Sequence, residues 1–265
     1  MATVPKPGNC PRGKLKCGIG NGNRLPSLHR EKHVEDPSSP RGRSLNETAR
    51  LKSFIGGLGV DLAGVADLKR LRGMPTGIGS DAEALTNRFH FAIVLGAQWN
   101  KLGTESTAND VCLFLEKAAL EVAAYLEEKG SPSLIVHPED EFDPVRRMGL
   151  LSLKVLAKEA GLGWQGRSLL IVSPECGPVH RWIAVLTSLE LEAGRPIGNR
   201  CGDCVLCIDR CPPGALRLVP FADHPEKRED VLDILACKGD DGCRVCLVVC
   251  PWMKRVEQRH AGYRS

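Results

Sequence analysis

The sequence predicts an α/β domain over residues 44–195, followed by a small cysteine-rich α+β module over residues 196–258. Two observations predict this fold class. Segments of helical periodicity alternate with short, almost wholly apolar runs along the first part of the chain. Eight of the 12 cysteines lie in the second part, between Cys201 and Cys250. At 265 residues, 42% of them hydrophobic, the chain has room for one large domain or two modest ones with a real core.

The N-terminal segment, residues 1–43, is rich in Pro, Gly, Ser and Asn and is predicted to be disordered. Residues 1–50 carry ten Lys/Arg and four Asp/Glu, so this segment holds the basic excess of a chain whose net charge is +4. A solvated arm is the preferred interpretation over a nucleic-acid-binding arm, because no aromatic residue is present there to stack on bases. Cys10 and Cys17 lie here and are not expected to bind a metal by themselves.

Ordered structure is expected to begin at Ser44, because Ser44-Leu-Asn-Glu47 matches a capping box. The apolar residues that follow share one helical face, and glycines at 56, 57 and 59 end this helix. The glycine-containing stretch 72–79 does not match a dinucleotide fingerprint and is predicted to be a loop. Further helices are predicted over 107–129 and 146–160, and strands over 60–66, 89–97, 134–136, 168–172 and 182–186.

The cysteines fall into two runs with a shared pattern. The first run is Cys201-x2-Cys204-x2-Cys207-x3-Cys211-Pro212, and the second is Cys237-x5-Cys243-x2-Cys246-x3-Cys250-Pro251. Eight thiolates are the number that two [4Fe–4S] clusters need, and a Cys-x2-Cys-x2-Cys-x3-Cys-Pro run is typical of bacterial ferredoxins. The sequence therefore predicts a ferredoxin-like module that holds two such clusters.

In such modules the cysteine before proline ligates the other cluster. One predicted ligand set is therefore Cys201, Cys204, Cys207 and Cys250, and the other is Cys211, Cys237, Cys243 and Cys246. Zinc sites more often pair two Cys-x2-Cys units or add histidine, and disulfide frameworks are typical of short secreted chains. Both alternatives fit this pattern less well than two iron–sulfur clusters do.

Three stretches resemble the epoxyqueuosine reductase family. They are Gly161–Pro178, which contains Gly-Leu-Gly-Trp-Gln-Gly-Arg, then Leu186-Thr-Ser-Leu, and finally the cysteine runs that end in Cys250-Pro251-Trp252. The resemblance covers about residues 55–255 and is most specific in the cysteine runs. It implies that residues 44–195 correspond to the catalytic domain of that family.

The resemblance implies a mechanism and cofactors. Enzymes of that family bind cobalamin in the α/β domain and reduce an epoxide on a modified tRNA nucleoside, and their clusters feed single electrons to cobalt. The family is also similar to reductive dehalogenases and corrinoid-reducing proteins. Trp164, Arg167 and Ser168 are the predicted cofactor-binding residues, although core packing is an equal interpretation for Trp164.

Three further residues are weaker candidates. His180 and Arg181 are candidates for handling substrate or protons, and Cys176 is a candidate redox thiol or an ordinary loop residue.

The sequence departs from the family pattern at two positions. Where the family carries the aspartate of an Asp-x-x-Pro motif, 17 residues before the tryptophan, this chain has Arg147. Arg167 stands where lysine is usual, which keeps the charge but changes the donor geometry. These departures indicate a short, divergent member whose substrate need not be epoxyqueuosine.

Two main functions compete. The first is an iron–sulfur oxidoreductase with cobalamin as a possible second cofactor, and the second is a ferredoxin-like protein that reduces a partner such as a corrinoid enzyme. A tRNA-binding protein with structural clusters is a third hypothesis. An electron-donor protein is the expected partner, with tRNA or a corrinoid protein as further candidates. The sequence contains no run of 18 apolar residues, so no membrane span is expected. Thiolate ligands must stay reduced, which favours the reducing cytoplasm as the compartment.

Overall fold

The computed structural model describes residues 39–73, 79–103, 107–138, 140, 142–225 and 227–253. Both predicted domains fall within one compact unit, Asp36–Ser265. The leader residues up to 38, with Cys10 and Cys17, lie outside the described part, as does most of the predicted 72–79 loop. Within the described part, no helix combines the length and the apolar character that a membrane span requires.

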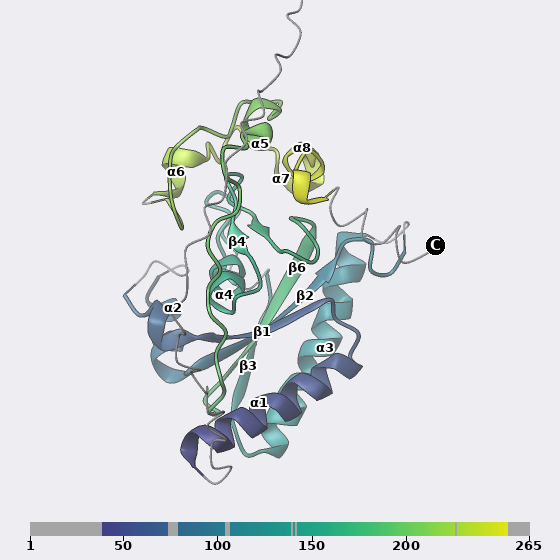
Figure 1. Ribbon diagram of the computed structural model, residues 1–265, viewed down its shortest axis with the longest axis vertical. Coiled ribbons are helices and arrows are strands. Elements are labelled where there is room, and N and C mark those ends of the chain that lie inside the picture. The colour runs from purple at the N-terminus through teal and green to yellow at the C-terminus, as the bar shows by residue number, and fades with distance from the viewer. Residues whose placement is uncertain are drawn as a thin grey trace, which may run out of the picture. The chain divides into compact units, whose positions relative to one another are not determined.

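Figure 1 shows how the helices and strands follow one another along the chain. The first part contains α1 (Pro40–Gly57), β1 (Leu62–Asp67), the 3₁₀ helix η1 (Leu68–Leu71), α2 (Gly79–Arg88), β2 (Phe91–Gln98), α3 (Ala108–Glu128), β3 (Ser133–Val136), α4 (Leu153–Glu159), β4 (Trp164–Gln165), β5 (Ile171–Val172) and β6 (His180–Thr187). The cysteine-rich part contains α5 (Leu206–Asp209), α6 (Arg228–Val231), α7 (Gly239–Gly242) and α8 (Val245–Val248).

A four-stranded sheet organises the first part, with the strand order β1-β2-β6-β3. Every neighbouring pair in it is antiparallel, and β2 pairs with β6 along its length, so that Ile93 lies opposite Val185. The mixture of helices and strands is confirmed, but the mostly parallel sheet that defines an α/β domain is not what forms. An apolar strand indicates that both faces of a sheet are covered, and it carries no information on the direction of its neighbours.

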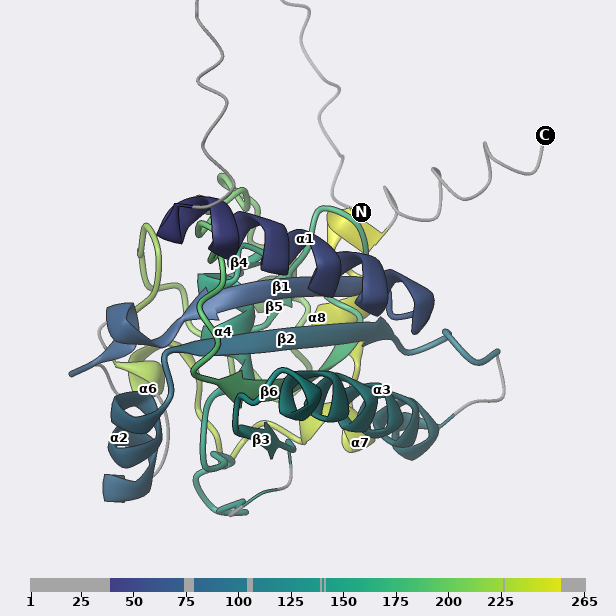
Figure 2. The same ribbon diagram turned by 90° about the horizontal axis from the view of Figure 1, so that it is seen from below.

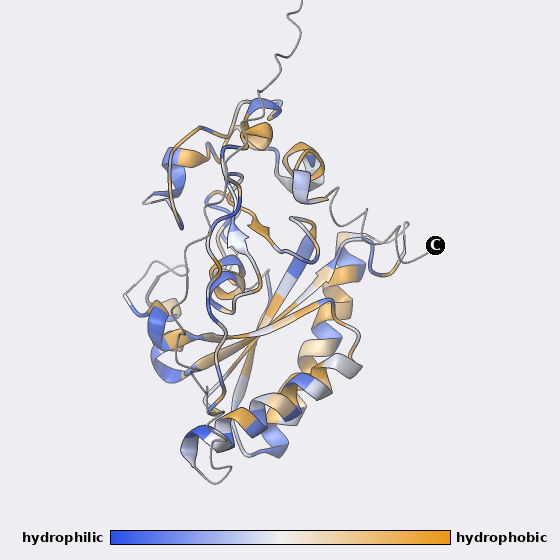
Figure 3. Ribbon diagram, in the orientation of Figure 1, coloured by the Kyte–Doolittle hydropathy of each residue, from blue (hydrophilic) through white to orange (hydrophobic). Residues whose placement is uncertain are grey.

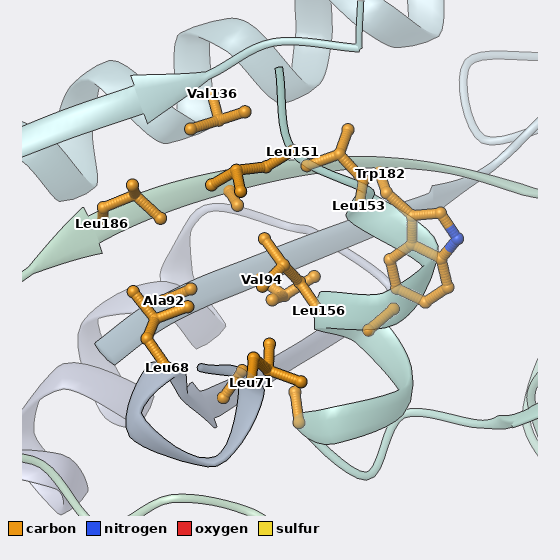
Figure 4. Packing of buried hydrophobic residues seen from close by; sticks show 14 of the residues in the cluster. Leu68, Leu71, Ala92, Val94, Val136, Leu151, Leu153, Leu156, Trp182 and Leu186 are labelled. Carbon is orange, nitrogen blue, oxygen red and sulfur yellow. The ribbon is translucent and has the colours of Figure 1, made fainter. Parts of the chain in front are cut away.

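Helices cover both faces of this sheet, as Figures 1 and 2 show. Successive side chains of a strand point to opposite faces. Ile93 and Leu95 therefore pack with α1 and α3 in one cluster, whereas Val94 packs with α4 in the other. Figure 4 shows the second cluster, in which Leu156 of α4 and Trp182 of β6 lie beside Val94. In Figure 3 the strands are mostly orange, and the first residues of β6 are blue.

Most predicted elements are confirmed to within about two residues at each end. These are the strands predicted over 60–66, 89–97, 134–136 and 182–186, and the helix over 107–129. The strand predicted over 168–172 is shorter, since only Ile171–Val172 pairs with Trp164–Gln165. Helix α3 begins with a capping box in which Thr107 and Asp110 bond each other's backbone N–H groups.

The first helix begins earlier than the predicted Ser44. Its N-cap is Ser39, whose hydroxyl accepts a hydrogen bond of 3.0 Å from the backbone N–H of Gly42. Pro40 occupies the first helical turn, where its missing N–H costs nothing and its fixed φ suits the helix. The predicted boundary at residue 43 was therefore wrong by four residues, because a Ser-Pro start was available upstream of the capping-box pattern.

The helix predicted over 146–160 forms only over its second half. The carboxylate of Asp143 accepts the backbone N–H groups of Val145 and Arg146 at 2.8 and 2.9 Å, which holds this segment in a turn. Arg147 has a φ of 49°, in the left-handed region that a helix does not allow. Helix α4 starts only after Ser152, which caps the backbone N–H of Val155. Helix α2 was not predicted, because it follows the glycine-containing stretch without a strong apolar stripe.

Candidate functional site

Two segments of the cysteine-rich part repeat the same backbone geometry. Each has the pattern Cys-x2-Cys-x3-Cys-Pro. The residues before the short helices α5 and α8 have nearly identical conformations, with φ −119° and ψ 12° at Val205 and φ −120° and ψ 12° at Arg244. The last cysteine of each segment donates its N–H to the carbonyl three residues earlier, at 3.1 Å for Cys211 and 3.3 Å for Cys250. The two segments are therefore a structural repeat.

The first group of thiols surrounds Cys207. The pKa of Cys207 is raised to about 12, first by burial and then by the thiols near it, which are those of Cys201, Cys204, Cys246 and Cys250. Burial is also the first cause that raises the pKa of Cys250, and Cys201 and Cys204 add to it, while backbone hydrogen bonds from Trp252 and Met253 oppose it. Cys250 of the second run thus lies with the cysteines of the first run.

The second group of thiols surrounds Cys246. Burial raises the pKa of Cys246 to about 11, and the nearby thiols that contribute are those of Cys237, Cys243 and Cys211. Cys211 of the first run thus lies with the cysteines of the second run. Metal binding opposes such upward shifts, because a cation stabilises thiolates over thiols. The exchange of one cysteine between the runs is the arrangement that the predicted ligand sets require.

The spacing of these thiols bears on the zinc alternative. Four thiolates around a zinc ion, each at about 2.3 Å from it, lie about 3.8 Å from one another. Among the described residues, no three His, Cys, Asp or Glu side chains are arranged to hold a single metal ion. A cubane of four irons is a larger body with one ligand at each of its four corners.

The hairpin formed by β4 and β5 packs against the end of the cysteine-rich part. Trp164 is 1% exposed and meets Trp252 edge to face, with ring centroids 4.7 Å apart. Gly177 approaches the same segment so closely that an added Cβ would lie 3.2 Å from the backbone of Trp252. Trp164 therefore packs in the core, which was one of the two roles that the sequence predicted for it.

Polar contacts tie this hairpin to the first cysteine loop. The side chain of Asn199 donates to the carbonyl of Gln165 and accepts the backbone N–H of Cys201, both at 2.8 Å. Arg167 donates from a guanidinium nitrogen to the carbonyl of Gly202 at 2.8 Å. Asn199 was not predicted, because a lone asparagine before a cysteine run carries no pattern of its own.

The predicted cofactor-binding residues lie on this hairpin. Ser168 is half-buried in the turn between β4 and β5, and Gly166 lies so near the cysteines that a Cβ there would be 3.6 Å from the Cys201 sulfur. Three buried nitrogens beside this hairpin have no hydrogen-bond partner within the described part of the chain: Trp164 Nε1, Arg167 Nε and His180 Nε2. The cofactor role of Trp164, Arg167 and Ser168 stays a prediction.

The other candidates lie at the start of β6. His180 is 9% exposed, and burial first, with a further contribution from Lys154, lowers its pKa to about 4, so it is neutral at pH 7. Arg181 lies 4.9 Å from the ring centroid of Trp99, and Arg244 lies 4.2 Å from the same centroid. This stack joins the sheet to the segment between Cys243 and Cys246. Cys176 is buried, as an ordinary core residue would be.

A pocket of about 430 Å³ lies away from this site. It adjoins α1 and is lined by Pro40, Arg41, Ser44, Leu45, Glu190, Leu191 and Glu192. Neither the cysteines nor the hairpin residues contribute to its lining. The predicted site residues therefore do not line this pocket; they lie where the hairpin meets the cysteine runs.

Comparison with curated proteins finds epoxyqueuosine reductases. No family model matches the chain. An epoxyqueuosine reductase of Synechococcus sp. (strain CC9605) is 41% identical over 118 residues, which cover 38% of this chain and 36% of that protein. Over these segments the chain is similar to epoxyqueuosine reductases. The matched segments of the first curated members span only 36–41% of their length.

Solved structures show the same fold. A crystal structure of epoxyqueuosine reductase with a tRNA-Tyr epoxyqueuosine-modified tRNA stem loop has a TM-score of 0.58 at 18% identity, over 79% of this chain and 66% of that chain. A reductive dehalogenase, whose structure is described as suggesting a mechanism for B12-dependent dehalogenation, has a TM-score of 0.62 at 18% identity, over 88% of this chain and 35% of that one.

Proposed function

We propose that this chain is an iron–sulfur oxidoreductase of the epoxyqueuosine-reductase type, which passes single electrons through two [4Fe–4S] clusters to a redox centre in the α/β domain. The exchange of Cys211 and Cys250 between two otherwise matched cysteine runs carries this proposal. A chain with one cluster has no use for that exchange. The reducing cytoplasm, where free thiols persist, is the compartment that suits this chemistry.

The proposed ligand sets follow the two groups of thiols, with Cys246, which contributes to both groups, assigned to the second. One cluster is held by Cys201, Cys204, Cys207 and Cys250, and the other by Cys211, Cys237, Cys243 and Cys246. The clusters supply one-electron transfer, which no amino-acid side chain in these runs provides. The protein holds the thiols half-buried, and the hairpin excludes water from one side of the first group through Trp164 and Trp252.

Cobalamin is the redox centre that we propose for the α/β domain. The residues present fit it in one respect, since unpartnered buried nitrogens at Trp164, Arg167 and His180 offer polar contacts to a bound group. The B12-dependent reductive dehalogenase that shares the fold supports this choice. When bound, cobalamin supplies a metal centre that accepts electrons one at a time. In that arrangement Arg167 orients the cofactor from the turn that also contacts Gly202.

A tRNA is the proposed macromolecular substrate, because a family member binds a modified tRNA stem loop in its crystal structure. Arg147 occupies the position of the family's acid, and a guanidinium does not donate a proton at neutral pH. The chain must therefore take its proton from another group or act on a substrate that needs none. A separate protein is the proposed electron donor.

Iron analysis and EPR spectroscopy test the clusters directly. Full-length protein reconstituted without oxygen should bind about eight iron and about eight sulfide ions per chain and give an EPR signal after reduction by dithionite. Colourless protein, or zinc in place of iron, would overturn the proposal. For cobalamin, titration with cob(II)alamin should change the corrinoid spectrum. Arg167→Ala should weaken this binding, whereas Arg50→Ala, an exposed position on α1, should not.

A ferredoxin-like electron-transfer protein is the second candidate, and Arg147 at the acid position favours it. The two functions differ in what the chain does with its electrons. A carrier reduces a corrinoid protein in stoichiometric amounts and turns over no small substrate, whereas the oxidoreductase consumes reductant catalytically when its tRNA substrate is present. Stopped-flow reoxidation of the reduced chain with each acceptor distinguishes them.

A further inference from the structure

The segment that carries Arg147 reaches the second cysteine run. Asp143 and Met148 form an isolated antiparallel bridge, and the turn between them holds Arg147 at a φ of 49°. From there the guanidinium extends to Gly239, where an added Cβ would lie 3.3 Å from one of its nitrogens. Gly239 itself has a φ of 73°, which favours glycine. The absence of a side chain at Gly239 thus leaves room for the guanidinium of Arg147.

Gly239 explains the irregular spacing of the second run. Five residues separate Cys237 from Cys243, where the first run has two between Cys201 and Cys204. The extra residues form the short helix α7, which begins at Gly239. The insertion therefore supplies the surface against which Arg147 lies, and it breaks the symmetry between two otherwise matched runs.

A second arginine, Arg228, lies beside the turn that carries Arg147. Arg228 of α6 donates from its guanidinium to the backbone carbonyl of Arg146 at 2.6 Å. Burial and the charge of Arg147 lower the pKa of Arg228, whereas Glu229 and the thiol of Cys237 raise it. Arg228 thus lies within the electric fields of both Arg147 and Cys237.

Two guanidinium groups act at this place. Arg147 and Arg228 repel each other, and the carboxylate of Glu229 opposes that repulsion at Arg228. Asp143 is paired with Arg146 and Asp233 with Arg217, so both of these carboxylates have cations of their own. Helix α7 also carries Asp240 and Asp241. Further negative charge at the sulfur of Cys237 would be attracted by both guanidiniums.

We propose that Arg147 and Arg228 raise the reduction potential of the cluster bound by Cys237 above that of the cluster bound by Cys201. Reduction adds one electron to a centre that its four thiolates already make anionic, and no bond forms or breaks. Nearby positive charge stabilises the reduced state, as Coulomb's law requires. The pair thus sets the order in which the two clusters accept electrons. This inference rests on the two clusters of the proposed function.

A redox titration followed by EPR tests the inference on the full-length, reconstituted protein, with dithionite as the reductant. Arg147→Gln and Arg228→Gln should each make reduction of the cluster bound by Cys237 about tenfold less favourable, which lowers its reduction potential by about 59 mV for one electron. The cluster bound by Cys201 should keep its potential. Arg147→Lys keeps the charge and should restore the potential. Arg50→Gln, which removes an exposed charge from α1, should change neither cluster.

Iron and sulfide analysis of every variant separates the possible outcomes. If the unmodified protein binds no clusters, the proposed function fails before this inference is tested. If both clusters are present and the glutamine variants leave both potentials unchanged, the inference is overturned. A potential that falls as far in Arg147→Lys as in Arg147→Gln would also overturn it, because contact geometry rather than charge would then be responsible.

Discussion

His180 predicts a specific loss of stability in mild acid. It lies buried at the start of β6, its ring centroid is 4.3 Å from that of Trp182, and its pKa is lowered from 6.5 to about 4. Between these two values the unfolded chain binds a proton that the folded chain does not. The free energy of unfolding must therefore rise with pH through this window and fall as the pH drops below 6.5.

The magnitude follows from the two pKa values. Each pH unit below the unfolded value costs about 1.4 kcal/mol until the folded value is reached. At pH 5.5 the loss attributable to His180 is therefore about 1 kcal/mol, and near pH 4 it approaches about 3 kcal/mol. His180→Gln removes this contribution, although it also lowers stability at every pH by disturbing the packing.

Urea unfolding at pH 7.5 and pH 5.5, measured anaerobically on the unmodified chain and on His180→Gln, provides the assay. Acid also weakens thiolate ligation, but it does so in both proteins, so the difference between their pH dependences isolates the imidazole. The unmodified chain should lose about 1 kcal/mol more than the variant. Equal losses in the two proteins would refute the reasoning and show that the imidazole gains its proton without cost in the folded state.

Three further predictions concern ligation and packing. Cys250→Ala should lower the bound iron by about half, since one cluster loses a ligand, whereas Cys112→Ala in α3 should leave the iron content unchanged. Gly177→Ala should destabilise the chain by about 2 kcal/mol in chemical unfolding, because its φ is 64° and Trp252 occupies the space that a Cβ needs; an unchanged midpoint would contradict the packing. Tyr125→Phe should lower stability by about 1 kcal/mol by removing a 2.8 Å hydrogen bond to a carboxylate on α1, and it should abolish the phenol titration whose pKa is raised to about 12.

Local chemistry made much of the first part predictable. Thr107 caps α3, and the apolar run that begins at Phe91 is a fully covered strand. Strand direction was not predictable, because the same apolar run fits a parallel or an antiparallel neighbour. The turn at Arg147 was missed for a related reason: its side-chain pattern suits a helix, and only the carboxylate of Asp143 and the glycine at 239 hold it in a turn.

The cysteines were the most informative part of the sequence for the site. Their spacing alone predicts which thiols exchange between the runs, and the two ligand sets stay a prediction. Cys250 is among the thiols that influence Cys207, and Cys211 is among those that influence Cys246. The supports of the site were less visible. Asn199 makes one hydrogen bond to Gln165, 34 residues away, and one to Cys201, two residues away. The contact with Gln165 leaves no periodic pattern in the sequence that could have predicted it.

The edge-to-face pair of Trp164 and Trp252 has a consequence for biosynthesis. The ribosome makes the hairpin tryptophan almost ninety residues before its partner, so the indole remains uncovered until the final cysteine and the proline after it have emerged. Completion of the hairpin core and completion of the ligand sets thus coincide in time.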